Sequence, residues 1–399
     1  MRTKCLAGAS VAALVVFGLL VSILPADPPP LGESPSEQEI EAHMQQWIDQ
    51  IATGETAEAV FSAAEGAIDD LGRFSDAGVQ YNMASAAAKG VIELLENLSD
   101  PDELRSVREI NAARTLAGLR QVGIRPTLGE LIAHANPGVR YYGWVGYGNI
   151  RNMCLRSENL RGGLVAGLSS RAGQEDSGVV VGEICRVLSL PKRMPDELDD
   201  PTVYKAVAAE FIAILHDNWG GWLPQAAADF TWADAVSEGA TAAANLATIM
   251  ELGDDDELKP KLLQDLVDAA GAGATLYRTA QDGHIRAGEL TEQAAGERQQ
   301  KAEQLTRESQ LLTADAARTE TAAAGMLLAC EDALNLLVGT DYDHLRLPLS
   351  GRRRVKLGEQ IIEKKIGSRS EQADAVQLGV IAWAKELGLD QPQVATPAE

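Results

Sequence analysis

The sequence predicts an all-α protein, and three features of the chain support this prediction. Hydrophobic residues make up 45% of the 399 residues, yet aromatic residues make up only 5%. The apolar residues are largely Ala, Leu and Val, and Ala has the highest intrinsic helix propensity. Apolar residues recur with a helical period, as in Val203, Val207, Phe211 and Leu215. We therefore expect helices packed on helices rather than a sheet.

The first 26 residues are expected to form a signal peptide or a membrane anchor. Arg2 and Lys4 precede an apolar run from Leu6 to Leu24, and this order is typical of a secretory signal. The run is long enough to cross a bilayer, so both cleavage and retention stay open. In either case the basic residues keep the start of the chain in the cytoplasm, and we expect export to the periplasm or cell envelope.

Composition divides the remaining chain into four regions. Residues 27–36 carry four prolines, which predicts an extended, exposed spacer. A helical-repeat region is expected at 37–253, followed by a long-helix region with C-terminal helices at 254–388. Residues 389–399 are expected to be a disordered tail.

Helix starts are marked by Asp or Asn followed by Pro, at Asp100, Asn136 and Asp200. The Asp or Asn side chain can accept hydrogen bonds from the first helical N–H groups. Pro at the next position lacks only an N–H group that would have gone unpaired. A related pattern places Val three residues after Asp or Asn, at Asp76–Val79, Asn136–Val139, Asp176–Val179 and Asp200–Val203.

The start Asn136-Pro137-Gly138-Val139-Arg140 opens the second helix of a pair, and Asp176 follows Asn136 by 40 residues. Residues 100–216 therefore resemble the HEAT repeat family, whose units of about 40 residues are helical hairpins. The resemblance implies a solenoid with a broad surface for another protein. Capping chemistry alone produces a similar pattern, and an irregular helical bundle is the alternative.

From about Ile285 the apolar pattern becomes that of a coiled coil. The seam consists of Leu305, Ser309, Leu312, Ala316, Thr319, Ala323, Met326, Cys330, Ala333 and Leu337. This pattern predicts a long helix from Ile285 to Val338 that ends at Gly339. Its small residues favour a close antiparallel partner helix from the same chain. Further helices are expected at 352–366 and 370–387.

No catalytic residue, cofactor or metal site is predicted. The five histidines are scattered, and His284, after Gly283, is expected in a turn. The acidic cluster at 254–257 precedes an expected helix, where acids interact favourably with the positive end of the helix dipole. Asp341, Asp343 and His344 lack the spacing and the glycine of an EF-hand loop and are expected in a polar turn. The three cysteines after residue 26 lack zinc-ligand spacing and are expected to be buried thiols, with one disulfide as the alternative; they are Cys154, Cys185 and Cys330.

Two segments are candidates for contact with a ligand or partner. The segment His216–Pro224 is expected to be a loop, because it contains two glycines and a proline. It would bring together groups with which exported proteins hold sugars, namely His216, Asp217, Trp219 and Trp222. The alternative is that both Trp rings are buried in helix packing.

The second candidate is a basic segment in an otherwise acidic chain of net charge −23. The segment from Arg346 to Arg369 contains eight Lys or Arg residues and only two Glu residues. Its central cations are Arg352, Arg353, Arg354 and Lys356. They are expected either to dock an acidic partner, a polyanionic glycan or lipid headgroups, or to offset the acidic surface of the same protein.

Together these features favour an exported, non-enzymatic interaction or scaffold protein whose partner is another envelope protein. The acidic charge argues against nucleic acid as a partner, and membrane contact is expected only through an uncleaved N-terminal segment. One alternative is an exported helical-toroid enzyme that acts on polysaccharide, although the chain has few aromatic residues. The other is a membrane-anchored structural spacer built on the long helix.

Overall fold

The computed structural model of the chain is all-α, as the sequence predicts, apart from two strands of two residues each. It consists of two compact units, Met1–Ile150 and Arg151–Glu399. The structure describes residues 27–98, 103–196, 198, 200–253, 257–339, 356–357, 360–361 and 368–393. The expected signal or anchor segment, residues 1–26, lies outside the described residues.

The first unit is a set of short helices that pack pairwise around an apolar core. In chain order they are α2 (Glu37–Thr53), α3 (Ala57–Gly72), α4 (Ala77–Asn97), α5 (Arg105–Gly118), the 3₁₀ turn η1 (Val122–Ile124), α6 (Arg125–Leu131) and the first part of α7 (Pro137–Leu155). Helix α2 packs on α3 and α4, and α5 packs on the same two helices. The Trp47 ring lies so close to Gly66 that a Cβ atom there would come within 2.3 Å of it.

The spacer before α2 contacts this unit more than the sequence suggests. Residues 27–36 form neither helix nor strand, as expected, and Ser36 caps α2 in a capping box with Glu39. Pro28 is buried, however, and residues 30–33 line a shallow hollow together with His43 and Asp70. Seven of the ten residues 27–36 are exposed, as expected, and the expectation is wrong only for Pro28.

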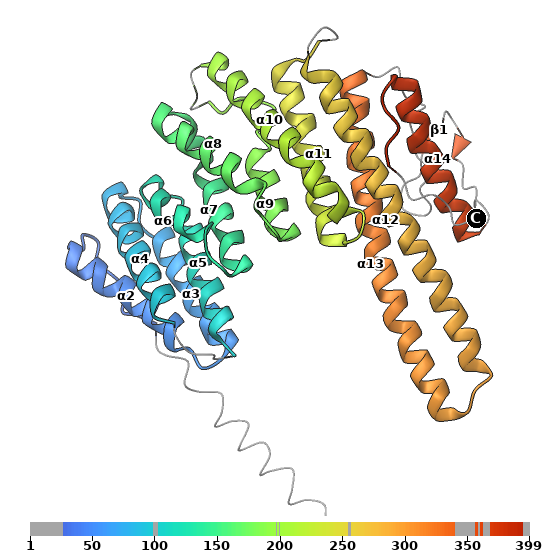
Figure 1. Cartoon of the computed structure of the whole chain (residues 1–399). Helices are drawn as coiled ribbons and strands as arrows, with labels where there is room; N and C mark the ends of the chain where they lie inside the picture. The colour runs from blue at the N-terminus through green and yellow to red at the C-terminus, as the bar shows by residue number, and fades with distance from the viewer. Residues whose placement is uncertain are drawn as a thin grey trace, which may run out of the picture. The chain divides into compact units, whose positions relative to one another are not determined.

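The second unit, seen in green to red in Figure 1, includes the two longest described helices, α12 and α13. After the end of α7 its helices are α8 (Glu158–Ala172), α9 (Gly178–Leu188), α10 (Pro201–Ala226), α11 (Phe230–Met250), α12 (Leu258–Ala295), α13 (Gln299–Val338) and α14 (Arg369–Leu387). Helix α11 packs against α9, α10 and α13, and α12 packs against α10, α13 and α14. The boundary expected between the helical-repeat region and the long-helix region, at residues 253 and 254, falls inside this unit. Helix α12 packs on helices from both sides of this boundary.

Three of the four recurring Asp or Asn positions cap helices as predicted. Asp76 accepts a hydrogen bond from the Val79 N–H at 2.9 Å, and Asn136 Oδ1 accepts one from Gly138 N–H at 2.9 Å. Asp200 accepts one from Thr202 N–H at 2.8 Å. At the fourth position Ser177, rather than Asp176, precedes the helix, and its side chain makes no capping bond. The HEAT-like repeat itself stays a prediction.

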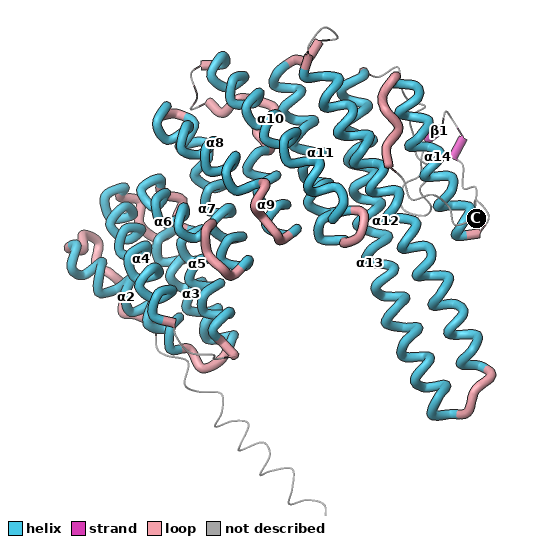
Figure 2. Tube along the Cα trace, viewed as in Figure 1, coloured by secondary structure: helices cyan, strands magenta, loops and turns pink. Residues whose placement is uncertain are grey.

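The predicted long helix is interrupted, because the chain reverses at residues 296–298. Helix α12 ends at Ala295, and α13 begins at Gln299 and runs back along it, with the short loop visible at the tip of the hairpin in Figure 2. The prediction of one helix from Ile285 is therefore wrong at its start. The expected antiparallel partner exists, and it is α12. Gly339, with φ 91°, ends α13 as predicted.

The predicted seam of α13 is confirmed, since none of its ten residues is exposed. Seven are buried and three are half-buried. The two helices approach closely where a Cβ atom on Gly283 would come within 3.0 Å of the Ala316 Cβ. Among the described residues, α13 is also the one helix long and apolar enough to span a membrane, and half of that apolar stretch is buried in the fold.

The two helices expected after Gly339 have different outcomes. The second is present as α14, which Ser368 caps in a capping box with Glu371. Four residues of the first expected helix, 352–366, are described, and they form β1 (Lys356–Leu357) and β2 (Gln360–Ile361), which pair antiparallel. The expected helix is wrong for these four residues, and the rest of it lies outside the described part of the chain.

The close approach of α12 and α13 predicts a sharp difference between two neighbouring alanines. Ala316→Leu should lower the free energy of unfolding by about 1–3 kcal/mol, because the added carbons have no space opposite Gly283. Ala317→Leu should have little effect, since Ala317 is exposed on the same helix. Urea denaturation measures both, and equal losses would contradict this account of the seam.

Candidate functional site

The segment His216–Pro224 lies within α10, so its expected loop is wrong. Gly and Pro weaken an isolated helix, but packing of its apolar face can outweigh that preference. Here the face includes Trp219 and Trp222, which are only 2% and 3% exposed. The alternative prediction, that both rings are buried in packing, is confirmed.

Each indole N–H group is held by a backbone carbonyl from another helix. Trp219 Nε1 donates to the carbonyl of Asp265 on α12 at 2.7 Å. Trp222 Nε1 donates to the carbonyl of Ala172, the last residue of α8, at 3.3 Å. The buried rings thus join α10 to α12 and to α8, which accounts for their place in the sequence without a ligand.

The two polar candidates of this segment lie on the surface and have different surroundings. His216 Nδ1 lies 2.8 Å from Asp265 Oδ2, a partner that sequence reasoning missed because it is 49 residues away. Burial of the Asp265 carboxyl raises its pKa, and the hydrogen bond with His216 opposes this shift. Asp217 is exposed and lines a hollow. The structure therefore does not bring the four predicted residues together around one ligand.

The hollow that Asp217 lines, which we call the α10 hollow, lies between α10, the loop after α8 and the start of α11. Its volume is about 660 Å³. It is lined by Gly173, Glu175, Asp176, Asp217, Asn218, Gly221, Trp222, Gln225 and Trp232. Five of these nine residues come from one face of α10, so the helical spacing itself assembles the floor.

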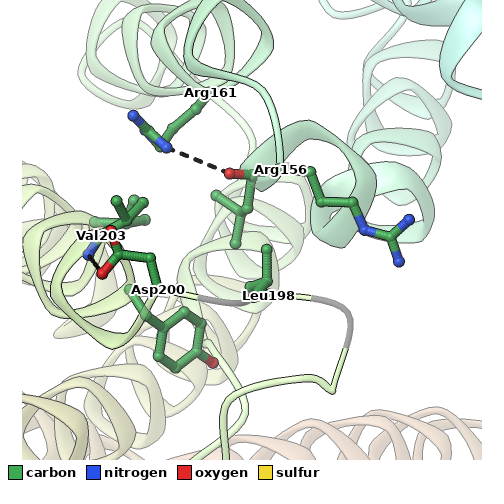
Figure 3. A pocket seen from close by; sticks show the side chains of 8 residues that line it. Arg156, Arg161, Leu198, Asp200 and Val203 are labelled. Carbon is green, nitrogen blue, oxygen red and sulfur yellow. Dashed lines mark hydrogen bonds between the residues drawn. The ribbon is translucent and has the colours of Figure 1, made fainter.

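A smaller hollow of about 290 Å³ lies between the end of α7, α8 and α10 (Figure 3). Its polar groups are engaged in holding helix ends. Arg161 donates to the carbonyl of Leu155 at 3.4 Å, and Asp200 caps α10. The Tyr204 hydroxyl donates to the Pro191 carbonyl at 2.6 Å, and burial raises the pKa of Tyr204 to about 12.

The two arginines of this smaller hollow do not form an anion-binding fork. Figure 3 shows the side chains of Arg156 and Arg161 pointing in different directions. The remaining lining is aliphatic, with Leu155, Leu198 and Val207 buried. This hollow is a packing feature at a junction of helices, and no chemistry is assigned to it.

The histidines that the structure describes all have polar partners. His43, His216 and His284 each lie within 2.9 Å of a carboxylate oxygen, and His134 Nδ1 accepts from Asn136 N–H. His284 lies in α12, so the turn expected there is wrong. Within the described ranges, no group of three or more His, Cys, Asp or Glu residues could hold a metal ion. The acidic clusters flagged in the sequence fall largely on residues outside those ranges.

The basic candidates lie almost wholly outside the described residues. The structure does not describe Arg352, Arg353 or Arg354, and of Lys356 it describes only the backbone, in β1. Their role as a docking or charge-balancing segment stays a prediction.

The cysteines in the described residues form no disulfide with one another and are buried thiols, as the sequence suggests. They are Cys154, Cys185 and Cys330. Burial raises the pKa of the Cys330 thiol to about 12 and raises that of Cys185 further. Since the thiolate is the nucleophile, these groups are poorly suited to covalent chemistry.

Comparison with family models, with curated proteins and with solved structures finds no match to this chain.

The packing of Trp219 predicts opposite effects of alanine at two glycines. A Cβ atom on Gly239 would lie 2.8 Å from the Trp219 ring, so Gly239→Ala should cost about 1–3 kcal/mol of stability. Gly220 has open space around it on the same helix as Trp219. Gly220→Ala should therefore stabilise by about 0.8–1 kcal/mol, since Ala is the better helix former. Thermal unfolding distinguishes the two, and a neutral Gly239→Ala would contradict the close approach.

The buried thiols predict slow alkylation of the native protein. At pH 8, iodoacetamide should leave Cys330 unmodified until urea unfolds the chain, because the thiol is buried and its pKa is about 12. A cysteine at Ala317, exposed on the same helix, serves as the positive control and should react at once. Mass spectrometry of the peptides reports each site separately. Rapid native labelling of Cys330 would show that α13 opens locally.

Proposed function

We propose that the chain is an exported, non-enzymatic interaction or scaffold protein of the cell envelope. Its helices would hold another envelope protein, on a surface organised as HEAT-like repeats. The observation that carries this proposal is the outer part of the α12–α13 hairpin, residues 285–315, which we call the arm.

The arm continues past the ends of α11 and α14 as a pair of helices (Figure 1). Arg369, at the start of α14, bonds to Gln281 on α12 at 2.8 Å, just before the arm begins. Within the arm the two helices hold each other, for example through Thr291 Oγ1 and Ser309 Oγ at 2.8 Å. At about 1.5 Å of rise per residue, the part of α13 that belongs to the arm, residues 299–315, is about 25 Å long.

Little of the arm serves the core. Its buried residues are few and mostly small, as Ala287, Ala294 and Ser309 show. Arg286 pairs with Glu289 one turn further along α12, and Lys301 in the first turn of α13 pairs with Glu297 in the loop between the helices. A thin projection of this kind adds much surface and little hydrophobic stabilisation, which suits a role in contact with a partner.

One apolar side chain stands out on the surface of the arm. Leu311 is 66% exposed, and Ile285 is exposed to a lesser degree. A partner that covers Leu311 would remove more apolar surface from water there than at Ile285. We infer that the partner contacts the arm around Leu311.

The proposal predicts that one leucine substitution abolishes partner capture and a matched one does not. Leu311→Glu in the tagged full chain should reduce recovery of the cross-linked envelope partner at least about tenfold, the effect of 1.4 kcal/mol. Leu378→Glu on α14 is the control, because Leu378 is also 66% exposed. Quantitative mass spectrometry of the cross-linked envelope fraction measures recovery. Equal recovery with both variants, or no protein enriched over an untagged strain, would refute the role of the arm.

A further inference from the structure

The chain beyond α14 lies against α12, and we call its residues 389–393 the tail. The sequence suggested disorder here, yet the tail contacts α12 and Pro392 is buried. Helix α14 ends at Gly388, whose φ of 66° is left-handed, and the Leu389 N–H donates back to the Ala384 carbonyl at 2.8 Å. The chain thereby turns, and Figure 1 shows the tail as a dark-red loop beside α12.

The side-chain amide of Gln264 holds the backbone of Asp390 at two points. The Asp390 N–H donates to Gln264 Oε1 at 2.9 Å, and Gln264 Nε2 donates to the Asp390 carbonyl at 3.2 Å. These are the two backbone groups that a neighbouring strand would pair with in a sheet. The contact uses no side-chain atom of Asp390, so an extended segment with another residue at this position could make it, except proline, which lacks the N–H.

Two turns further along α12, Gly271 leaves space for a proline ring. A Cβ atom on Gly271 would come within 2.6 Å of Pro392 Cβ and within 3.4 Å of the Gln393 carbonyl oxygen. The ring can therefore lie here only because Gly271 has no side chain. Pro392 is buried, whereas Asp390, Gln391 and Gln393 are exposed. The proline is thus the most deeply buried residue of the tail.

We propose that Gln264 and Gly271 mark a binding site for an extended, proline-containing segment of a protein partner, and that the tail occupies this site until the partner displaces it. We call this site the tail site. Backbone hydrogen bonds at one position and a side-chain pocket at another are the usual means by which extended peptides are bound. The proposal is independent of the arm, because the tail site lies at residues 264–271 of α12 and the arm begins at residue 285.

The charge beside the tail indicates which segment could displace it. Burial raises the pKa of the Asp268 carboxyl, the hydrogen bond from Gln264 lowers it, and the nearby charge of Asp390 raises it again. Two carboxylates at close range repel each other, so Asp390 weakens the contact of the tail with α12. A partner segment with Lys or Arg two positions before its proline would replace this repulsion by attraction. The tail site therefore fits a segment that is basic where the tail is acidic.

The test uses a fluorescent peptide with the sequence of residues 389–399 and the chain truncated after Gly388, which retains all of α14 and its cap. Fluorescence polarisation should show saturable binding to the truncated chain. The full chain should bind the peptide at least about tenfold more weakly, because its own tail competes at an effective concentration of about 1 mM. Absence of binding to the truncated chain, or equal binding by both chains, would overturn the proposal.

A variant of the full chain repeats this test without truncation. Pro392→Ala in the full chain should weaken the hold of the tail, so this variant should bind the peptide more tightly than the unchanged full chain does. Unchanged binding would contradict competition by the tail. Urea unfolding shows whether each chain is folded, so a misfolded truncation is recognised and this variant then decides.

Two glycines of α12 give a matched pair of blocking variants. Gly271→Leu in the truncated chain should raise the Kd of the peptide at least about tenfold, the equivalent of 1.4 kcal/mol. Gly288→Leu should leave the Kd unchanged, because Gly288 is exposed on the same helix and a Cβ atom on it would meet nothing within 4 Å. Equal effects of the two variants would overturn the assignment of the tail site.

The peptide itself provides two further pairs. Pro392→Ala should weaken binding to the truncated chain, and Pro397→Ala, beyond the tail, should not. Asp390→Lys should tighten binding about 2–5-fold, as expected for one exposed charge contact. Glu399→Lys makes the same change of charge at the end of the peptide and should have no effect. If both lysine peptides bind equally tightly, the acidic surface attracts them in general, and the preference for a basic residue is refuted.

Two further measurements separate other occupants and the other proposal. Sedimentation velocity of the full chain should show no dimer that the truncation abolishes, since such a dimer would mean that the tail occupies the site of a second copy, and it would overturn the contact within one chain. The substitution Leu311→Glu in the truncated chain should leave peptide binding unchanged. The arm and the tail site can therefore fail separately.

Discussion

Close approach of helices at small residues sets the spacing on which the packing of both units depends. In the first unit the Trp47 ring occupies the space beside Gly66, and in the second the Trp219 ring occupies the space beside Gly239. At the hairpin, Gly283 faces Ala316. Protein interiors have few voids, so each large ring requires a residue with little or no side chain opposite it. This arrangement is consistent with the low aromatic content of the chain and with its many Ala and Gly residues.

Polar groups that look functional in the sequence largely hold helices together. The buried Asp70 carboxylate accepts hydrogen bonds from His43 and Trp47 at Oδ2 and forms an ion pair with Arg73 at Oδ1, so both of its oxygens have partners. Arg151 extends to the end of α9 and donates to three carbonyls there. The last carbonyls of a helix lack partners within it, so a guanidinium group at that place stabilises the helix end. The contacts of Asp70 and Arg151 are thus explained by the packing of the helices.

The arm differs from these clusters. It consists of exposed helix surface with few buried residues, so the core of the unit does not account for it. This exposed surface is what a protein partner would contact.

The sequence by itself determined the helical class, the helix starts at Asp76, Asn136 and Asp200, and the seam of α13. These depend on residues a few positions apart, such as the hydrogen bond from Val79 N–H to Asp76, or the seven-residue repeat that includes Met326 and Ala333. Only the tertiary structure decided where the long helix reverses and whether His216–Pro224 forms a loop or a helix. The partners that hold this segment are Asp265 and Ala172, more than 40 residues away along the chain. Local propensity at two glycines favours a break, and burial of two indole rings against distant helices outweighs it.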